Sequence, residues 1–213
     1  RYWSMDAETG TSGIADFAVV GRSARFDGLR AAVPTGLTVG QLGDRWTVGG
    51  WVRPLQRTDD RVEPVFAARD EQGAGFAVSY DGGAGSYVLD ALPAGPRPPG
   101  GGAAPRPRPP HPVRSFQHVA VIVALGRAAL YVDGELAGRL ELPAAPRARL
   151  SIGSDGRAGE GFRGLIDEVR LWDRALIAAE LADVRQRDKD AAEVDPPRLD
   201  RLDADLEPGG DLK

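Results

Sequence analysis

Asp167 is the residue of this 213-residue chain whose surroundings most require a chemical partner. It lies in a strand-like segment, Gly161 to Leu176, that reads GFRGLIDEVRLWDRAL. In a regular strand, Asp167, Val169 and Leu171 share one parity, so a carboxylate points the same way as two apolar side chains. An ionised carboxylate in that setting needs a cation or several hydrogen-bond donors. The candidate partners for the Asp167 carboxylate are a metal ion, backbone N–H groups, an arginine, or the end of the first strand.

The elements that would position Asp167 are many short strands separated by glycine- and aspartate-bearing turns. The segment ALYVDGELAG, from Ala129 to Gly138, predicts a hairpin with Asp133-Gly134 as its two-residue turn. The other strands are expected over Tyr2 to Asp6, Ala24 to Phe26, Ala31 to Val33, Trp46 to Val52, Val65 to Arg69, Phe76 to Tyr80, Tyr87 to Leu92, His118 to Leu125 and Leu150 to Ile152. This pattern favours an all-β, two-sheet antiparallel sandwich.

One short C-terminal helix is expected from Ala178 to Lys189, because Ile177, Leu181 and Val184 recur at helical spacing. Ile177 stands where a capping serine or threonine would be favourable, which weakens the helix start by roughly 1 kcal/mol. Residues 1–189 are expected to form the domain.

Two other segments differ from an ordinary sandwich. Residues 93–112 hold nine of the 17 prolines and a triple glycine, so we expect an insertion without ladder pairing. It is expected to be a surface loop, with a ligand for an SH3-like partner as the alternative. Residues 190–213 form an acidic tail, either a linker or a short docking helix.

Several motifs occur in the order typical of one family. They are WSMD near the start, ARFDG at 24–28, HVA at 118–120, YVDGELAG, and GLIDEVRLWDRAL. Over roughly Tyr2 to Leu181 the chain resembles the concanavalin A-like jelly roll of the laminin G (LamG) type. The resemblance implies a jelly-roll sandwich that binds glycans or protein surfaces through loops at one rim or through the concave sheet. The loops over 55–63, 81–86 and 155–160 are the candidates.

The resemblance also implies a possible structural calcium ion near a sheet edge. Members of the wider superfamily bind it with aspartates and backbone carbonyls, which suits a hard cation with six to eight oxygen ligands. By position, the metal ligands here would be Asp6, Asp167 and Asp27.

The sequence offers no catalytic set. Glycoside hydrolases with this jelly roll carry two glutamates on one strand face, about 5 Å apart, whereas the run at 166–169 has no second glutamate at the required spacing. His111 and His118 lie in different contexts, and no zinc-protease, serine-elbow or phosphate-loop motif is present. We therefore expect a non-catalytic module, without a catalytic residue or a cofactor-binding residue.

Aromatic residues offer the remaining candidates for a site. His118 is expected to be packed rather than a ligand. Trp3, Trp46, Trp51 and Trp172 are candidate sugar-stacking platforms, although strand tryptophans usually belong to the core. Trp46, Val48 and Val52 share one face and Trp51 the other, and Trp172 is the tryptophan most expected to be exposed.

The composition limits the classes of partner that the protein could bind. A net charge of −4 leaves no basic field for nucleic acid, and no apolar run of 18 residues is present for membrane insertion. The absence of cysteine excludes thiolate chemistry, and the arginine-rich, asparagine-free composition indicates a bacterial origin. Because the chain begins without methionine, we expect a part of a larger, secreted or cell-surface protein.

The expected function of the chain is glycan or protein recognition in adhesion. The alternatives are assembly with a neighbouring domain or subunit, and an accessory segment of a polysaccharide hydrolase or lyase.

Overall fold

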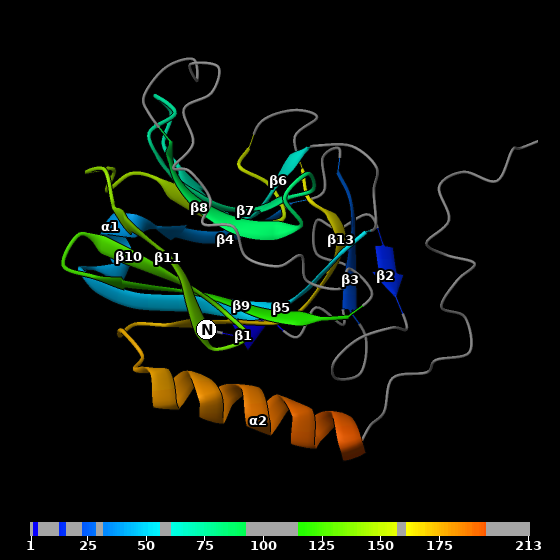
Figure 1. Ribbon diagram of the computed structural model, residues 1–213. Coiled ribbons are helices and arrows are strands. Elements are labelled where there is room, and N and C mark those ends of the chain that lie inside the picture. The colour runs from blue at the N-terminus through cyan, green and yellow to red at the C-terminus, as the bar shows by residue number, and fades with distance from the viewer. Residues whose placement is uncertain are drawn as a thin grey trace, which may run out of the picture.

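The protein is a two-layer β-sandwich with one long helix on the outer face of the larger sheet (Figure 1). The computed structural model describes residues 2–3, 13–15, 23–28, 32–55, 61–92, 115–156 and 161–194. All strand pairs among them are antiparallel. The expected all-β fold class is therefore confirmed. Neither helix of the described residues has the length and apolar character needed to cross a bilayer.

The larger sheet has eight strands and the smaller sheet five. The larger sheet is ordered β11-β10-β9-β5-β13-β3-β2, with β1 also paired to β13. Its strands are β1 Tyr2–Trp3, β2 Gly13–Ala15, β3 Ser23–Asp27, β5 Arg45–Pro54, β9 Gln117–Ala124, β10 Arg127–Val132, β11 Glu135–Glu141 and β13 Arg163–Trp172. The smaller sheet is ordered β4-β12-β6-β7-β8, with β4 Val33–Thr38, β6 Val62–Arg69, β7 Gly75–Asp81, β8 Ser86–Leu92 and β12 Arg149–Ile152. The helices are α1 Val39–Leu42 and α2 Ala178–Val194.

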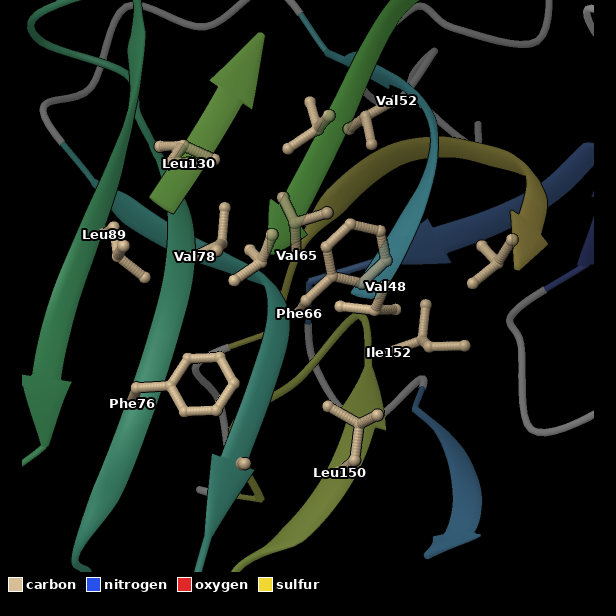
Figure 2. Close-up of a cluster of buried hydrophobic side chains, with 14 of the residues drawn as sticks. Val48, Val52, Val65, Phe66, Phe76, Val78, Leu89, Leu130, Leu150 and Ile152 are labelled. Atoms are coloured by element: carbon tan, nitrogen blue, oxygen red, sulfur yellow. The ribbon is translucent and has the colours of Figure 1, made fainter. Parts of the chain in front are cut away.

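The main core lies between the two sheets. Figure 2 shows apolar side chains from both layers facing one another, among them Val48 and Val52 of β5 and Phe66 and Phe76 of the smaller sheet. Trp46 belongs to the same core, as the alternation in β5 predicts. Interdigitated apolar layers of this kind are the principal source of stability in a sandwich.

The predicted hairpin forms as expected. β10 pairs with β11 around Asp133 and Gly134, whose φ angles are 52° and 83°. Two consecutive left-handed residues define a turn whose twist matches the flanking strands, and aspartate followed by glycine tolerates it best. The central position of β9, between β10 and β5, explains why its sequence is apolar on both faces.

The predicted parity of Asp167 is wrong, because β13 contains a bulge. The register against β5 shifts between Asp167 and Arg170, and Glu168 adopts a left-handed φ of 51°. Asp167 pairs with Trp51, whose side chain lies on the outer face, whereas Val169 and Leu171 belong to the core between the sheets. The extra residue therefore separates the carboxylate from the two apolar side chains.

Helix α2 continues beyond its expected end. It runs to Val194, so the helix includes the first residues assigned to the tail. Ile177 supplies no capping oxygen, but Glu180 Oε2 accepts its backbone N–H at 2.9 Å. Half of a capping box is therefore present. The proline-rich segment 93–112 and residues 195–213 lie outside the described residues.

Candidate functional site

The described residues of the three candidate loops lie at one end of the sandwich, and these residues with their neighbours are here called the loop rim. Its described residues are Asp27–Gly28, Leu55, Arg61–Glu63, Asp81–Ser86, Gly153–Gly156 and Gly161–Arg163. Backbone hydrogen bonds join them: Gly82 N–H donates to Arg61 O at 2.9 Å, Leu55 N–H to Arg163 O at 3.0 Å, and Gly161 N–H to Gly28 O at 3.1 Å. The sequence could not rank these loops, and the fold brings their described ends to the same end of the sandwich.

Glu63 and Arg163 connect the two sheets at the loop rim. Glu63 is buried, and its Oε2 accepts the backbone N–H of Arg163 at 3.0 Å. The Arg163 side chain lies over Gly28, where an added Cβ would be 2.2 Å from Arg163 Cγ. Gly28 also has a φ of 79°, so both its backbone and its lack of a side chain are required here. Arg163 Nε is buried and has no hydrogen-bond partner within the described part of the chain.

Two tyrosines lie behind the turn between β7 and β8. The rings of Tyr80 and Tyr87 meet edge to face, with centroids 5.3 Å apart. Burial raises the pKa of Tyr80, and the nearby carboxylates of Asp81 and Glu63 raise it further. Burial also raises the pKa of Tyr87 well above its usual value. Both phenols are therefore neutral at ordinary pH, and their rings are packed rather than presented to a sugar.

The structure separates two of the expected metal ligands. Asp27 pairs with Arg163 and Asp167 lies four residues further along β13, about 13 Å at the usual strand rise. Ligand oxygens lie about 2.3–2.6 Å from calcium, so one ion cannot take both carboxylates. Asp6 lies outside the described residues. No group of three or more His, Asp or Glu side chains in the described ranges is placed to hold a metal ion.

Asp167 has a structural partner of the kind the sequence allowed. The side chain is fully buried, and its Oδ1 accepts the backbone N–H of Glu168 at 2.9 Å. This hydrogen bond stabilises the left-handed bulge. The calcium site remains a prediction, limited to one of the two aspartates.

His118 is packed, as expected. It is buried, and its ring meets the Trp51 ring edge to face at 5.3 Å. The pKa of His118 is lowered from 6.5 to about 3, chiefly by burial and also by the nearby Arg185 and Arg170. The imidazole is therefore neutral and supplies no charge to a ligand.

The tryptophans follow the expected faces. Trp46 lies in the core and Trp51 on the opposite face of β5, beneath α2. Trp172 is half-buried against Leu176 and Leu181. No conclusion is drawn for Trp3, whose side chain is outside the described set.

Sequence reasoning missed a polar cluster beneath α2. Arg170 donates to both Asp188 and Glu168, and Trp51 Nε1 donates to Asp188 Oδ2 at 2.8 Å. Asp188 is 3% exposed and continues the helical spacing of Leu181 and Val184. A carboxylate at the third position of an apolar stripe was the signal that could have revealed this cluster.

Comparisons with known proteins agree on the fold. The family model described as the concanavalin A-like lectin/glucanases superfamily, of the laminin G type, matches residues 27–182. A search of curated protein sequences gave no match.

Several solved structures share the architecture at low identity. Domain 4 of AbnA, an extracellular arabinanase from Geobacillus stearothermophilus solved with arabinotriose, is 21% identical with a TM-score of 0.59, and the match covers 86% of each chain. The sialidase of Trypanosoma rangeli is 20% identical with a TM-score of 0.59, over 84% of this chain and 31% of the sialidase. The binding domain of Paraclostridial Mosquitocidal Protein 1 is 12% identical with a TM-score of 0.54, over 83% and 46%. The chain thus spans less than half of the last two proteins.

Proposed function

Since the chain belongs to the laminin G-type family of the concanavalin A-like lectin/glucanases superfamily, we propose that it is a non-catalytic carbohydrate-binding module of a larger, extracellular protein. The loop rim is the proposed binding surface. The arabinanase domain with a bound oligosaccharide supports this assignment by its fold.

The observation that carries the proposal is that the described ends of three separate loops lie together at one end of the sandwich. Binding residues are often placed on loops that a rigid scaffold positions. Here backbone hydrogen bonds between Arg61, Gly82, Leu55 and Arg163 fix the loops relative to one another. Exposed Arg61 and half-buried Asp81 and Arg163 supply donors and acceptors for sugar hydroxyls.

The non-catalytic assignment rests on the carboxylates that the fold commits elsewhere. Glu63 accepts a backbone N–H, Asp167 stabilises the bulge, and Glu168 is bound by Arg170. A retaining hydrolase needs two carboxyl groups facing one another about 5 Å apart across a sugar. Glu63, Asp167 and Glu168 instead use their carboxylates to bind groups of the protein itself.

A panel of oligosaccharides that includes arabinan fragments and sialosides tests the proposal. We expect a measurable dissociation constant by titration calorimetry and no release of product. Arg61→Ala should weaken binding by about tenfold, the loss of one charged hydrogen bond. Arg127→Ala is the matched control, because Arg127 is an exposed arginine on β10, outside the loop rim.

Two results would overturn the proposal. The first is an absence of binding across the panel. The second is binding that Arg127→Ala weakens and Arg61→Ala leaves unchanged, which places the ligand elsewhere. Turnover of any polysaccharide would overturn the non-catalytic assignment.

A specific observation favours assembly as the second candidate function. Leu125 and Ile177 are each 65% exposed and Leu136 is 45% exposed, and all three lie outside the loop rim. Leu125 occupies a left-handed turn position with a φ of 52°, which leucine adopts at a cost. Single exposed apolar residues are common on protein surfaces, so the strained backbone at Leu125 is what makes this position a candidate contact. Light scattering of the unsubstituted chain and of Leu125→Asn tests this. A concentration-dependent oligomer that dissociates in the variant supports assembly. A monomer at all concentrations contradicts it.

A further inference from the structure

Helix α2 rests on the sandwich without belonging to its main core. The helix lies along the outer face of the larger sheet (Figure 1). Every described residue of the core between the sheets comes from strands or their connecting loops, and none comes from α2. The helix therefore has its own attachment, on the other side of β5, β9 and β13.

The apolar part of that attachment is small. Leu181 and Val184 are the buried apolar side chains of α2 among its described residues, and Leu181 packs with Leu176 and Ala120. A helix that docks through apolar contacts alone usually carries three or four apolar residues every two turns. Between Val184 and Val194 the helix sequence holds no other large apolar residue, only charged and polar residues and two alanines.

An ion pair occupies the position where the apolar stripe would continue. Asp188 lies seven residues after Leu181 and is buried. Arg170 of β13 contacts it with two nitrogens, Nη1 to Oδ2 at 2.8 Å and Nη2 to Oδ1 at 2.7 Å. Trp51 Nε1 adds a third donor at 2.8 Å. A bidentate pair with a supporting donor fixes both position and orientation.

The bulge in β13 supports this pair. Glu168, in its left-handed conformation, accepts from the same Arg170 guanidinium. A second contact lies one turn away along α2, where Arg185 Nη2 is 4.0 Å from Asp133 Oδ1 at the hairpin turn. The polar attachment thus joins α2 to two separate strands and one turn.

We infer that α2 is a detachable strap, anchored by the Asp188–Arg170 pair, that leaves the sheet as a unit while the sandwich stays folded. Removal of one partner from a buried ion pair leaves an uncompensated charge and is strongly destabilising, so the attachment of α2 depends on this pair. Release uncovers an aromatic surface on the outer face of the larger sheet, formed by Trp51, His118, Ala120, Tyr131 and Trp172.

The absence of cysteine from the chain allows a direct test. Ala120 lies beneath α2 and Ala128 lies in the core between the sheets, on neighbouring strands, and both are buried. In the full chain, Ala120→Cys and Ala128→Cys each give one reporter thiol. The inference predicts that a thiol reagent labels position 120 about tenfold faster or more, because α2 opens without global unfolding.

A second substitution tests the anchor. Asp188→Asn should accelerate labelling at position 120 by about tenfold and leave position 128 unchanged. Glu180→Gln is the matched control, because it removes the exposed Arg174–Glu180 pair of the same helix and should change labelling at position 120 much less. Hydrogen exchange of the unsubstituted chain gives an independent measure: α2 amides should exchange through an opening that keeps β9 protected.

The outcomes separate the alternatives. Equal labelling rates at positions 120 and 128, or equal exchange of α2 and β9, would show that the helix opens only with the whole domain and would overturn the inference. Acceleration of both thiols by Asp188→Asn, or of neither, would overturn the anchor. A failure of glycan binding at the loop rim has no bearing on these results.

Discussion

Gly50 of β5 lies directly across the ladder from the bulge at Glu168 and Val169. An added Cβ at Gly50 would lie 2.9 Å from Val169 Cγ2 and 3.1 Å from the carbonyl oxygen of Asp167. The bulge places two residues of β13 opposite this one residue of β5. The close approach of the two backbones explains why a glycine stands in the middle of a central strand.

Gly50→Ala should therefore lower the free energy of unfolding by about 1–3 kcal/mol, through the crowding of a packed core. Gly138→Ala is the matched control, because Gly138 is also a strand glycine and has nothing within 4 Å of an added Cβ. We expect it to be neutral or slightly stabilising. Urea unfolding of both variants measures the difference. Equal effects would mean that the bulge does not constrain Gly50.

His118 should make the protein sensitive to acid. Its pKa is lowered from 6.5 to about 3 in the folded state, chiefly by burial. Between these two values the unfolded chain binds a proton that the folded chain does not, so stability is complete above pH 6.5 and falls as the pH drops toward 3. At pH 5 the loss should be about 2 kcal/mol.

Urea unfolding at pH 7.5 and pH 5 measures this loss. His118→Gln should reduce the difference between the two pH values, because glutamine does not titrate. A pH dependence that is the same in the variant would assign the acid sensitivity to other groups.

Ile177→Ser should stabilise the start of α2. The Glu180 carboxylate already accepts the backbone N–H of residue 177, so a serine hydroxyl would complete the reciprocal pair. We expect a gain of about 1 kcal/mol, seen as a higher melting temperature by circular dichroism. Ile177→Ala is the control, since it removes the exposed side chain and adds no capping oxygen. An equal change in both variants would assign the effect to the lost isoleucine.

The calcium prediction now has a sharper test. If an ion is bound, EGTA should lower the melting temperature, and either Asp27→Asn or Asp167→Asn should abolish that shift, but not both. The register of β13 requires this, because it places the backbones of the two aspartates about 13 Å apart along the strand, too far for one ion to bind both carboxylates. An EGTA-insensitive melt would contradict the ion itself. Loss of the shift in both variants would contradict the register argument.

The fold could be predicted from the sequence because its signals are local. Alternation in β5 assigns Trp46 and Trp51 to opposite faces, and the structure places them so. The Asp133-Gly134 turn is encoded by two adjacent residues. The family motifs gave the layer architecture, which the family match confirms.

The details of the site depend on long-range geometry that the sequence does not display. The left-handed conformation of Glu168 has no signature, because glutamate rarely adopts it, and this one residue reversed the predicted face of Asp167. The Arg170–Asp188 pair joins residues 18 apart through a helix whose docking face had to be known first. The proximity of the three rim loops likewise follows from sheet order and not from any one loop.

The extra residue in β13 affects how relatives should be compared at this strand. Ile166 and Val169 both face the core although they are three positions apart, an odd spacing that a regular strand forbids. A relative whose strand is regular at this point would present its aspartate on the same side as the residues aligned with Val169 and Leu171, even where the letters match column by column. Residues of this strand correspond when they share a partner on β5, whatever an alignment of sequences shows.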